Sequence, residues 1–355
     1  MRIPCSLGIV IGTASALALA VGAGAAPAKP GTGPNYVDEP QPHLERAREL
    51  AAKEPGWRHP GLIPCYRHEG NATGGASLAN PLPRRIFDNL WYVGNGGYGP
   101  YIVKTSAGLI LLDAMSNQYD IQRGLALRMQ AAGLNPADIK IVIVTHGHPD
   151  HYGGAKYIQE KYKARVYMAP ADWDWSAILQ KDPREQKGFG PVPDRDLDVV
   201  DGGKITLGDT TIRTWITPGH TPGTLSMLIP VTENGKSYTI AHISGITSKG
   251  LSAVLHHAFD ASAARFQKIM RENKVDGFIS SHPNYDDAVY KIALMDTRPD
   301  DPNPFLIGTD NTVLFMDIVR QCNLNNADLE ARGLDGSGGG FNPTQPDYKL
   351  GPDGW

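Results

Sequence analysis

The chain has 355 residues, of which 41% are hydrophobic, enough apolar material for one large core or two modest ones. Its formal net charge of −3 is spread along the sequence without blocks of lysine and arginine. Because nucleic-acid binding needs clustered basic side chains, we expect no nucleic-acid partner and favour a globular enzyme that acts on a small-molecule substrate.

The first 26 residues have the pattern of an export signal. Arg2 precedes the apolar run SLGIVIGTASALALAVGA, and Ala23 to Ala25 read as a small-residue cleavage site. A membrane anchor is the alternative, but the run is rich in alanine and glycine and ends in a cleavable pattern. We therefore expect a periplasmic or secreted protein with no stable membrane span after signal removal. Nothing in the sequence indicates its oligomeric state.

The rest of the chain divides by composition into three parts. A Pro-rich extension over 27–83 contains one helical pattern, PHLERARELAAKE, and is expected to wrap a catalytic region over 84–320. A tail over 321–355 becomes rich in glycine and proline after Gly333. Without Cys5 in the signal, only Cys65 and Cys322 remain, which either pair in an oxidising compartment or stay separate thiols.

The catalytic region alternates strand and helix patterns in two series. The first series is RIFDNLWYVG, PYIVKTSAGLILLDA, a helix from Gln118 to about Ala132, a strand over 139–144, a helix over 154–163 and the strand ARVYMAP. The second series is KITLG, TTIRTWITPGH, TLSMLIPV, SYTIAHISG, a helix over 260–273, the strand in GFISSHPN and a last helix in NTVLFMDIVRQC. The two series mirror each other.

Five histidines follow directly after predicted strands, so we expect them to converge on one edge of the fold. They are His146, His148 and His151 in THGHPDHYGG, His220 in TPGHTPG and His282 in SSHPN. Imidazoles with one carboxylate, Asp150, suit zinc and leave coordination positions open for catalysis, although such sites also accept iron, manganese or cobalt. His146 and His148 can reach one ion while Asp150 and His151 face another direction, which favours two metal ions.

The motifs THGHPDH, TPGHTPG and SSHPN, in this order and at these separations, resemble the metallo-β-lactamase superfamily over about residues 84–300. The resemblance implies an α/β fold, a four-layer αβ/βα sandwich of two mixed β-sheets with outer helices. It also implies two Zn²⁺ ions, one held by His146, His148 and His220. The other would be held by Asp150, His151 and His282.

The branch of the superfamily depends on the segment AHISGIT between the third and last histidines. Glyoxalase II, tRNA-processing and lactonase members carry a bridging aspartate there, and the first two β-lactamase subclasses carry a cysteine. The segment has neither residue in this chain, so the chain is most similar to subclass B3. Those enzymes commonly have a serine where Gly245 falls, and Thr247, Ser248 and Lys249 are candidate substrate-binding replacements.

The resemblance predicts an exported dizinc hydrolase in which a metal-bound hydroxide attacks the carbonyl of a β-lactam or related cyclic amide, an activity that confers antibiotic resistance. Asp150 would act as both ligand and catalytic orienter of the hydroxide. Asp113, at the end of GLILLD, is either the acceptor for a ligand histidine's second N–H or a plain strand-end acceptor. The alternatives are a lactone or thioester hydrolase and a non-catalytic periplasmic zinc-binding protein.

Other polar and aromatic residues have a structural interpretation that we favour. His242, His256 and His257 would be ligands only if strand register placed them inward. Tyr98, Tyr101 and the aromatics of ADWDWSAIL either line the substrate cleft or pack in the core and rim, and packing is favoured.

Overall fold

The computed structural model describes residues 41–54, 56, 60–65, 80–181, 188–248, 251 and 253–332. All of them lie within one unit of the chain, Glu39–Trp355. The predicted export signal, most of the tail and Lys249 lie outside the described residues. Among the helices that are described, none has the length and apolar character needed to span a bilayer.

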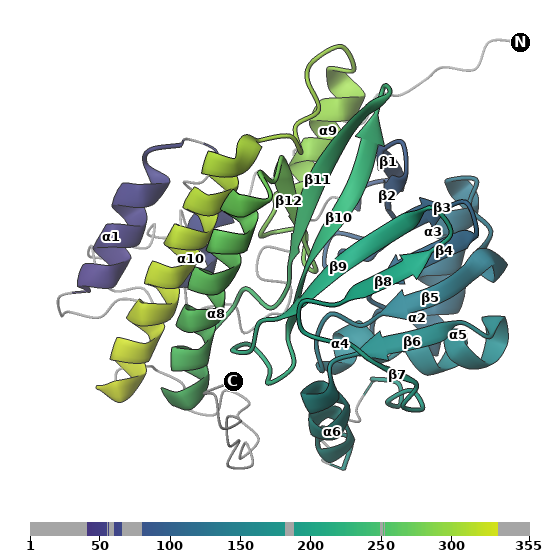
Figure 1. The fold of residues 1–355 in the computed structure, drawn as a ribbon, viewed down its shortest axis with the longest axis horizontal. Coiled ribbons are helices and arrows are strands. Elements are labelled where there is room, and N and C mark those ends of the chain that lie inside the picture. Colours follow the sequence, from purple (N-terminus) through teal and green to yellow (C-terminus); the bar gives the residue numbers. More distant parts are fainter. Residues whose placement is uncertain are drawn as a thin grey trace, which may run out of the picture. The chain divides into compact units, whose positions relative to one another are not determined.

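The strands form two mixed sheets (Figure 1). The seven-stranded sheet keeps chain order, antiparallel from β1 to β4 and parallel from β4 to β7. Its strands are β1 (Arg84–Phe87), β2 (Leu90–Tyr92), β3 (Tyr101–Thr105), β4 (Gly108–Leu112), β5 (Ile139–Ile143), β6 (Arg165–Met168) and β7 (Leu197–Asp198). The five-stranded sheet has the order β12-β11-β10-β9-β8, in which only β11 and β12 are parallel. Its strands are β8 (Lys204–Leu207), β9 (Thr210–Ile216), β10 (Leu225–Glu233), β11 (Lys236–Ile243) and β12 (Gly277–Ser280).

Helices cover the outer face of each sheet (Figure 1). The described α-helices are α1 (Pro42–Ala51), α2 (Gln118–Asp120), α3 (Ala126–Ala131), α4 (Pro149–Tyr152), α5 (Ala155–Tyr162), α6 (Pro170–Leu179), α8 (Ala253–Glu272), α9 (Ala288–Thr297) and α10 (Gly308–Ala331). A π-turn, η3 (Ile121–Leu125), joins α2 to α3, and the short 3₁₀ segments are η2 (Pro60–Cys65) and η4 (Pro136–Asp138). The helix expected over residues 118–132 is therefore one helical stretch with a π-turn inside it.

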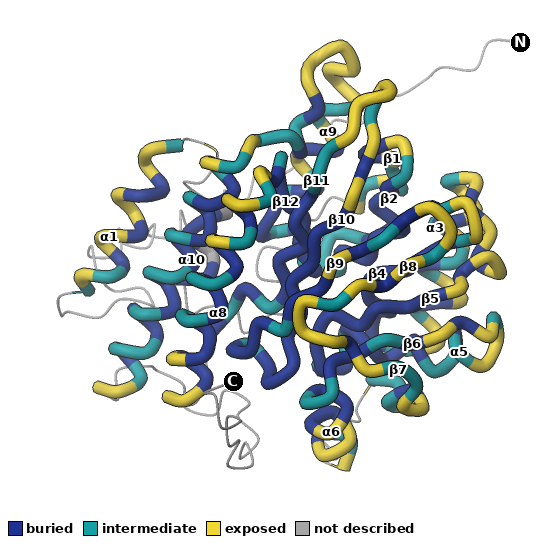
Figure 2. The backbone as a smooth tube through the Cα atoms, viewed as in Figure 1, coloured by how far each residue is buried: buried dark blue, intermediate teal, exposed yellow. Residues whose placement is uncertain are grey.

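Three apolar layers hold the sandwich together, and alternating strand residues supply them. In β4, Leu109 and Leu111 face the helix layer of the first sheet, whereas Ile110 and Leu112 face the second sheet. Because strand side chains alternate between faces, a strand buried on both sides reads as the continuous apolar run LILL. Figure 2 shows the centre of the fold, where strands of the two sheets face each other, as largely buried. The predicted αβ/βα sandwich is confirmed.

The last two long helices extend further than the sequence patterns predict. The expected helix over 260–273 is α8, which begins at Ala253, and α10 runs from Gly308 to Ala331. The boundary expected at residue 320 thus falls inside α10. The part of α10 beyond the predicted helix is polar in sequence. Its Asn323, Asn325 and Asn326 are nevertheless buried, because other segments of the chain pack against them. Helical periodicity does not reveal such long-range partners.

The N-terminal extension is fastened to α10. Both α1 and η2 pack against this helix, and His43 of α1 forms a 3.0 Å hydrogen bond with Gln321. Cys65 at the end of η2 and Cys322 of α10 form a disulfide across a sequence separation of 257 residues. Of the two states left open by the sequence, the structure thus has the paired one.

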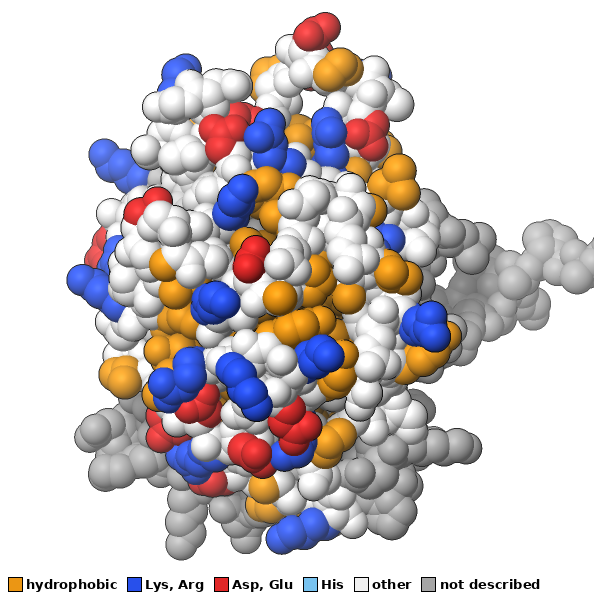
Figure 3. Space-filling model, turned by 90° about the vertical axis from the view of Figure 1, so that its right-hand side faces the viewer, with side chains coloured by type: hydrophobic (Ala, Val, Ile, Leu, Met, Phe, Trp, Pro, Cys, Tyr) orange, Lys and Arg blue, Asp and Glu red, His pale blue; other side chains and the backbone are white. Residues whose placement is uncertain are grey.

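On the face shown in Figure 3, basic, acidic and hydrophobic side chains are interspersed. Lysine and arginine do not gather into a single region on that face. The mixture agrees with the absence of basic blocks in the sequence.

We expect the double substitution Cys65→Ser and Cys322→Ser to lower the free energy of unfolding by roughly 2–5 kcal/mol. Without the disulfide a very long loop is no longer closed in the unfolded chain, so the conformational entropy of the unfolded state rises. Denaturant unfolding measures this free energy. Reductant should shift the unfolding midpoint of the unaltered protein toward that of the variant and leave the variant unchanged. Equal midpoints for the two proteins would contradict the expectation.

Candidate metal centre

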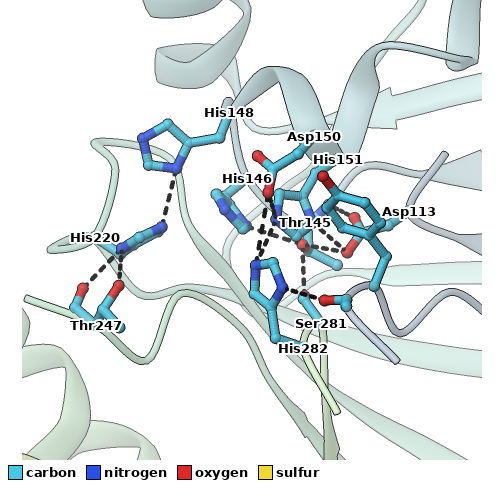
Figure 4. A network of polar contacts seen from close by, with 12 residues as sticks. Asp113, Thr145, His146, His148, Asp150, His151, His220, Thr247, Ser281 and His282 are labelled. Carbon is cyan, nitrogen blue, oxygen red and sulfur yellow. Dashed lines mark hydrogen bonds and ion pairs between the residues drawn. The ribbon is translucent and has the colours of Figure 1, made fainter. Parts of the chain in front are cut away.

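The six predicted ligands come from three loops that begin where strands end (Figure 4). The segment after β5 carries His146 and His148 and turns into α4, which carries Asp150 and His151. His220 lies between β9 and β10, and His282 lies just after β12. The strand ends therefore bring together side chains that are up to 136 positions apart, from His146 to His282.

The side chains form two adjacent groups of three. One potential ligand atom from each of His146, His148 and His220 lies within 4.8 Å of the other two, and the same holds for Asp150, His151 and His282. In the first group, His148 Nδ1 is 2.9 Å from His220 Nε2. In the second group, His151 Nε2 is 3.2 Å from His282 Nε2 and 3.3 Å from Asp150 Oδ2. Figure 4 shows His146 on the side of its group that faces Asp150, His151 and His282.

The second nitrogen of four of these rings is held by a neighbouring oxygen. These contacts join His146 Nδ1 to Thr145 Oγ1 (3.1 Å), His151 Nδ1 to Asp113 Oδ2 (2.9 Å), His220 Nδ1 to the Thr247 carbonyl (2.7 Å) and His282 Nδ1 to the Gly97 carbonyl (2.9 Å). Such contacts fix the orientation of a ligand ring and direct its other nitrogen toward the metal. The Nε2 atom of His146 is buried without a hydrogen-bond partner, and coordination of a metal ion would satisfy its lone pair.

Asp113 ties the end of β4 to the start of the ligand loop. Its Oδ1 accepts a 2.8 Å hydrogen bond from the Thr145 backbone N–H, and its Oδ2 accepts one of 2.9 Å from the Thr145 hydroxyl. The same Oδ2 contacts His151, so the strand-end contacts and the contact with a predicted ligand are both present. Burial raises the pKa of Asp113. His151 and the hydrogen bond from the Thr145 backbone lower it by more, so the pKa of Asp113 lies below its ordinary value.

The electrostatics of the site favour neutral rings in the first ligand group and positive charge in the second. Burial lowers the pKa of His148 to about 4, and burial with neighbouring imidazoles lowers the pKa values of His146 and His220 as well. The buried Asp113 and the partly buried Asp150 lie beside His151 and raise its pKa to about 10 against the effect of burial. Neutral rings are the form that binds a metal, and the carboxylates favour positive charge between them. The donor set therefore fits a metal site.

The three expected substrate-binding residues have different surroundings. Thr247 lies beside His220, where both its carbonyl and its hydroxyl are within 3.3 Å of the His220 Nδ1 atom. The buried Ser248 hydroxyl accepts a 3.2 Å hydrogen bond from Asn326 of α10. Lys249 lies outside the described residues.

The other histidines have structural contacts instead. His242 is buried in β11 and its Nδ1 contacts the Ser244 hydroxyl at 2.9 Å. His256 and His257 lie on α8 rather than on a strand, and His256 contacts Asn323 and Glu330 of α10. None of the three belongs to the two ligand groups found among the described residues.

Aromatic side chains border the ligands. The Trp175 ring of α6 lies 5.1 Å from the His148 ring, and the Tyr98 ring lies 6.1 Å from the His282 ring. Tyr101 is instead fully buried and donates a 2.9 Å hydrogen bond to Asp286, as the packing interpretation predicts.

Asp286 supports the turn that carries His282. It accepts hydrogen bonds from the backbone N–H of Ser280 (2.8 Å) and of Ala288 (3.0 Å) in addition to the Tyr101 hydroxyl. Burial raises its pKa to about 6 despite these contacts and the nearby Lys291. No motif in the sequence marks Asp286, and its partner Tyr101 lies 185 positions away on β3.

Gly245 leaves no space for a side chain. Its φ of +57° lies in the left-handed region, and an added Cβ would lie 2.6 Å from the His220 Cβ. The departure from the serine of similar enzymes therefore has a steric reason here: the backbone approaches a predicted ligand too closely.

Two facing mixed sheets with helices outside, and two ligand groups at the strand ends, define a metallohydrolase-like domain. Residues 100–232 match the family model of the metallo-beta-lactamase superfamily, the family that the motifs resemble.

Solved structures share the fold. BJP-1, a subclass B3 metallo-β-lactamase of Bradyrhizobium japonicum, is 24% identical with a TM-score of 0.59, covering 75% of this chain and 98% of that chain. Native FEZ-1 metallo-β-lactamase from Legionella gormanii is 24% identical with a TM-score of 0.61, covering 73% of this chain and 98% of that chain. At this level of identity the likeness concerns the fold.

Curated relatives match shorter stretches. The N-acyl homoserine lactonase AttM of Azorhizobium caulinodans is 30% identical over 138 residues, 34% of this chain and 49% of the relative. A hydroxyacylglutathione hydrolase of Rhodopseudomonas palustris is 35% identical over 80 residues, 22% of this chain and 25% of the relative. The match thus spans a quarter to a half of the length of these relatives.

We expect Gly245→Ser to weaken metal binding about tenfold or more, because the new side chain displaces His220. Zinc retained after dialysis against a chelator, measured by atomic emission, reports the change. Gly202→Ser is the control, since Gly202 has a similar φ of +69° and open space around it. Equal zinc retention in both variants would show that the contact with His220 does not matter.

We also expect Asp286 to make stability depend on pH. Its pKa rises from 3.8 when unfolded to about 6 when folded, so its contribution is greatest in acid and is lost as pH rises from about 4 to 6. The free energy of unfolding of the unaltered protein, minus that of Asp286→Asn, should fall by roughly 3 kcal/mol between pH 4 and pH 7. Denaturant titrations across this range test the sign, and a constant or rising difference would refute it.

Proposed function

We propose that this protein is an exported, zinc-dependent hydrolase with two metal ions that opens the ring of a β-lactam or a related cyclic amide. The observation that carries the proposal is the pair of adjacent ligand groups, three histidines in one and Asp-His-His in the other. Three protein ligands per ion leave coordination positions open, which is typical of catalytic rather than structural zinc. The substrate would be a small molecule.

Zinc fits the spacing and chemistry of the donors. Two nitrogens bound to one tetrahedral zinc lie about 3.3 Å apart, given zinc–nitrogen distances of about 2.0–2.1 Å. The separations of 2.9 Å in the first group and 3.2 Å in the second are close to this value. His146, His148 and His220 would hold one ion, and Asp150, His151 and His282 the other.

When bound, the metal ions would polarise the scissile carbonyl and make water more acidic. Hydrolysis forms a C–O bond from water, breaks the C–N bond of the ring and transfers one water proton to the released nitrogen. Asp150 would orient the attacking water through its carboxylate, whose pKa is lowered by His151 and the other histidines against the effect of burial. Asp113 would hold the His151 ring in the orientation that directs Nε2 into the site.

The segment after β11 supports a cyclic amide as the substrate class. A bridging aspartate at this place is the feature that the motif resemblance associates with lactonases and glyoxalase II. Here the position next to His220 is Gly245, where an added Cβ would lie 2.6 Å from the His220 Cβ. Within the described residues, the two ligand groups contain one carboxylate, that of Asp150 in the second group.

A lactone or thioester is the second candidate substrate. The identities to an N-acyl homoserine lactonase and a hydroxyacylglutathione hydrolase favour it. The same ligands would serve this reaction, because fold and metal site alone do not determine the substrate.

Export is supported by the disulfide between Cys65 and Cys322, since such bonds persist mainly in oxidising compartments. The predicted signal over residues 1–26 would direct the chain there.

Turnover of a chromogenic cephalosporin, an acyl lactone and a thioester by the purified, zinc-loaded protein tests the proposal. We expect the cephalosporin to be hydrolysed with the highest kcat/KM. His146→Ala should lose at least 100-fold in rate and one zinc equivalent, whereas His257→Ala, at an exposed position on α8, should change neither. Preference for the lactone or thioester would establish the second candidate. Zinc binding without turnover of any of the three would make this a metal-binding protein.

A further inference from the structure

Asp172, in the first turn of α6, contacts two of the ligand-bearing loops at once. Its Oδ2 accepts hydrogen bonds of 2.6 Å from the Gly147 backbone N–H and of 2.6 Å from the Thr221 hydroxyl. Its Oδ1 accepts one of 2.7 Å from the Gly223 backbone N–H. Three donors thus meet on one fully buried carboxylate.

These contacts lie directly beside one ligand group. Gly147 stands between His146 and His148, and Thr221 follows His220. Every ligand of the first group is therefore next to a residue that donates to Asp172. In the second group, Asp150 and His151 lie on α4 and His282 follows β12, and no hydrogen bond joins Asp172 to these described residues.

The loops approach α6 so closely that only glycine fits at both backbone contacts. A Cβ at Gly223 would lie 2.7 Å from the Asp172 Cγ, and a Cβ at Gly147 would lie 2.7 Å from the Ser176 hydroxyl. Ser176, one turn after Asp172, donates a 2.9 Å hydrogen bond to the Gly147 carbonyl. Side chains of α6 thereby form hydrogen bonds with both the backbone N–H and the backbone carbonyl of Gly147.

Hydrogen bonds to a carboxylate are stronger than those between neutral groups, and a buried donor left without a partner is destabilising. The position of Asp172 in the first turn of α6 also favours its negative charge. Loss of the carboxylate would therefore let the two loops separate rather than remain in place with unsatisfied donors.

We propose that Asp172 is a positioning residue that holds the two loops at the spacing required by the His146, His148 and His220 group, and so sets metal affinity at this group in particular. This inference rests on the proposed function in one respect, namely that the group binds zinc. It adds a residue to the site that neither the motifs nor the ligand geometry includes.

Zinc competition with a chromophoric chelator tests the inference in Asp172→Asn. An amide leaves one acceptor oxygen and places an NH₂ group against a backbone N–H. Burial raises the pKa of Asp172 to about 6, so measurement at pH 8 compares the amide with an ionised carboxylate. We expect one of two zinc equivalents to bind 10- to 100-fold more weakly and the other to keep its affinity.

Asp174→Asn is the matched control, because Asp174 lies on the same helix with an exposed side chain paired to Arg195. It should bind both equivalents as the unaltered protein does. Thr221→Val removes one of the three donors and should weaken the same equivalent by a smaller factor, which keeps the test available if Asp172→Asn does not fold. Unfolding midpoints of the zinc-free proteins show whether a variant is merely less stable.

The outcomes separate this inference from the proposed function. Unchanged affinity for both equivalents in Asp172→Asn, or equal weakening of both, would overturn the positioning role while leaving a zinc hydrolase in place. If the unaltered protein bound no zinc, the proposed function itself would fail.

Discussion

Convergence of buried and partly buried imidazoles and carboxylates at the strand ends is the constraint that the surrounding contacts have to satisfy. Ring nitrogens of His148 and His220, and of His151 and His282, face each other at 2.9 and 3.2 Å, and His146 Nε2 is buried without a partner. Polar groups taken from water in this way need a partner to offset their desolvation. The oxygens of Thr145, Asp113, Thr247 and Gly97 satisfy the outer side of the rings, which leaves the inner side for a cation.

The supporting contacts follow one pattern around the site. A buried aspartate lies behind each loop: Asp113 behind the segment after β5, Asp172 beside the His148 and His220 loops, and Asp286 under the turn after β12. Each accepts at least one backbone N–H, so each fixes main chain rather than only a side chain. Loops without regular structure gain rigidity from such contacts, which a metal site requires of its ligands.

The sequence predicts the donor residues and the two strand series because both depend on local patterns, and the motif resemblance adds the sandwich and the division of the donors between two ions. Apolar runs mark strands buried on both faces, and the THGHPDH spacing identifies a donor cluster without knowledge of distant segments. Asp172 and the cysteine pair depend on partners far along the chain, as does the contact of Asp286 with Tyr101, and no local pattern encodes those partners. The underestimated length of α10 has the same cause, since its asparagines are buried against η2 and α8.

The covalent link between η2 and α10 also bears on how the molecule is assembled. Cys322 follows Cys65 by 257 residues, so a chain that emerges from its N-terminus exposes the first thiol long before the second exists. Closure therefore has to await the arrival of α10, after both sheets have left the ribosome. Until α10 has been synthesised, the thiol of Cys65 lacks the partner with which it forms this disulfide.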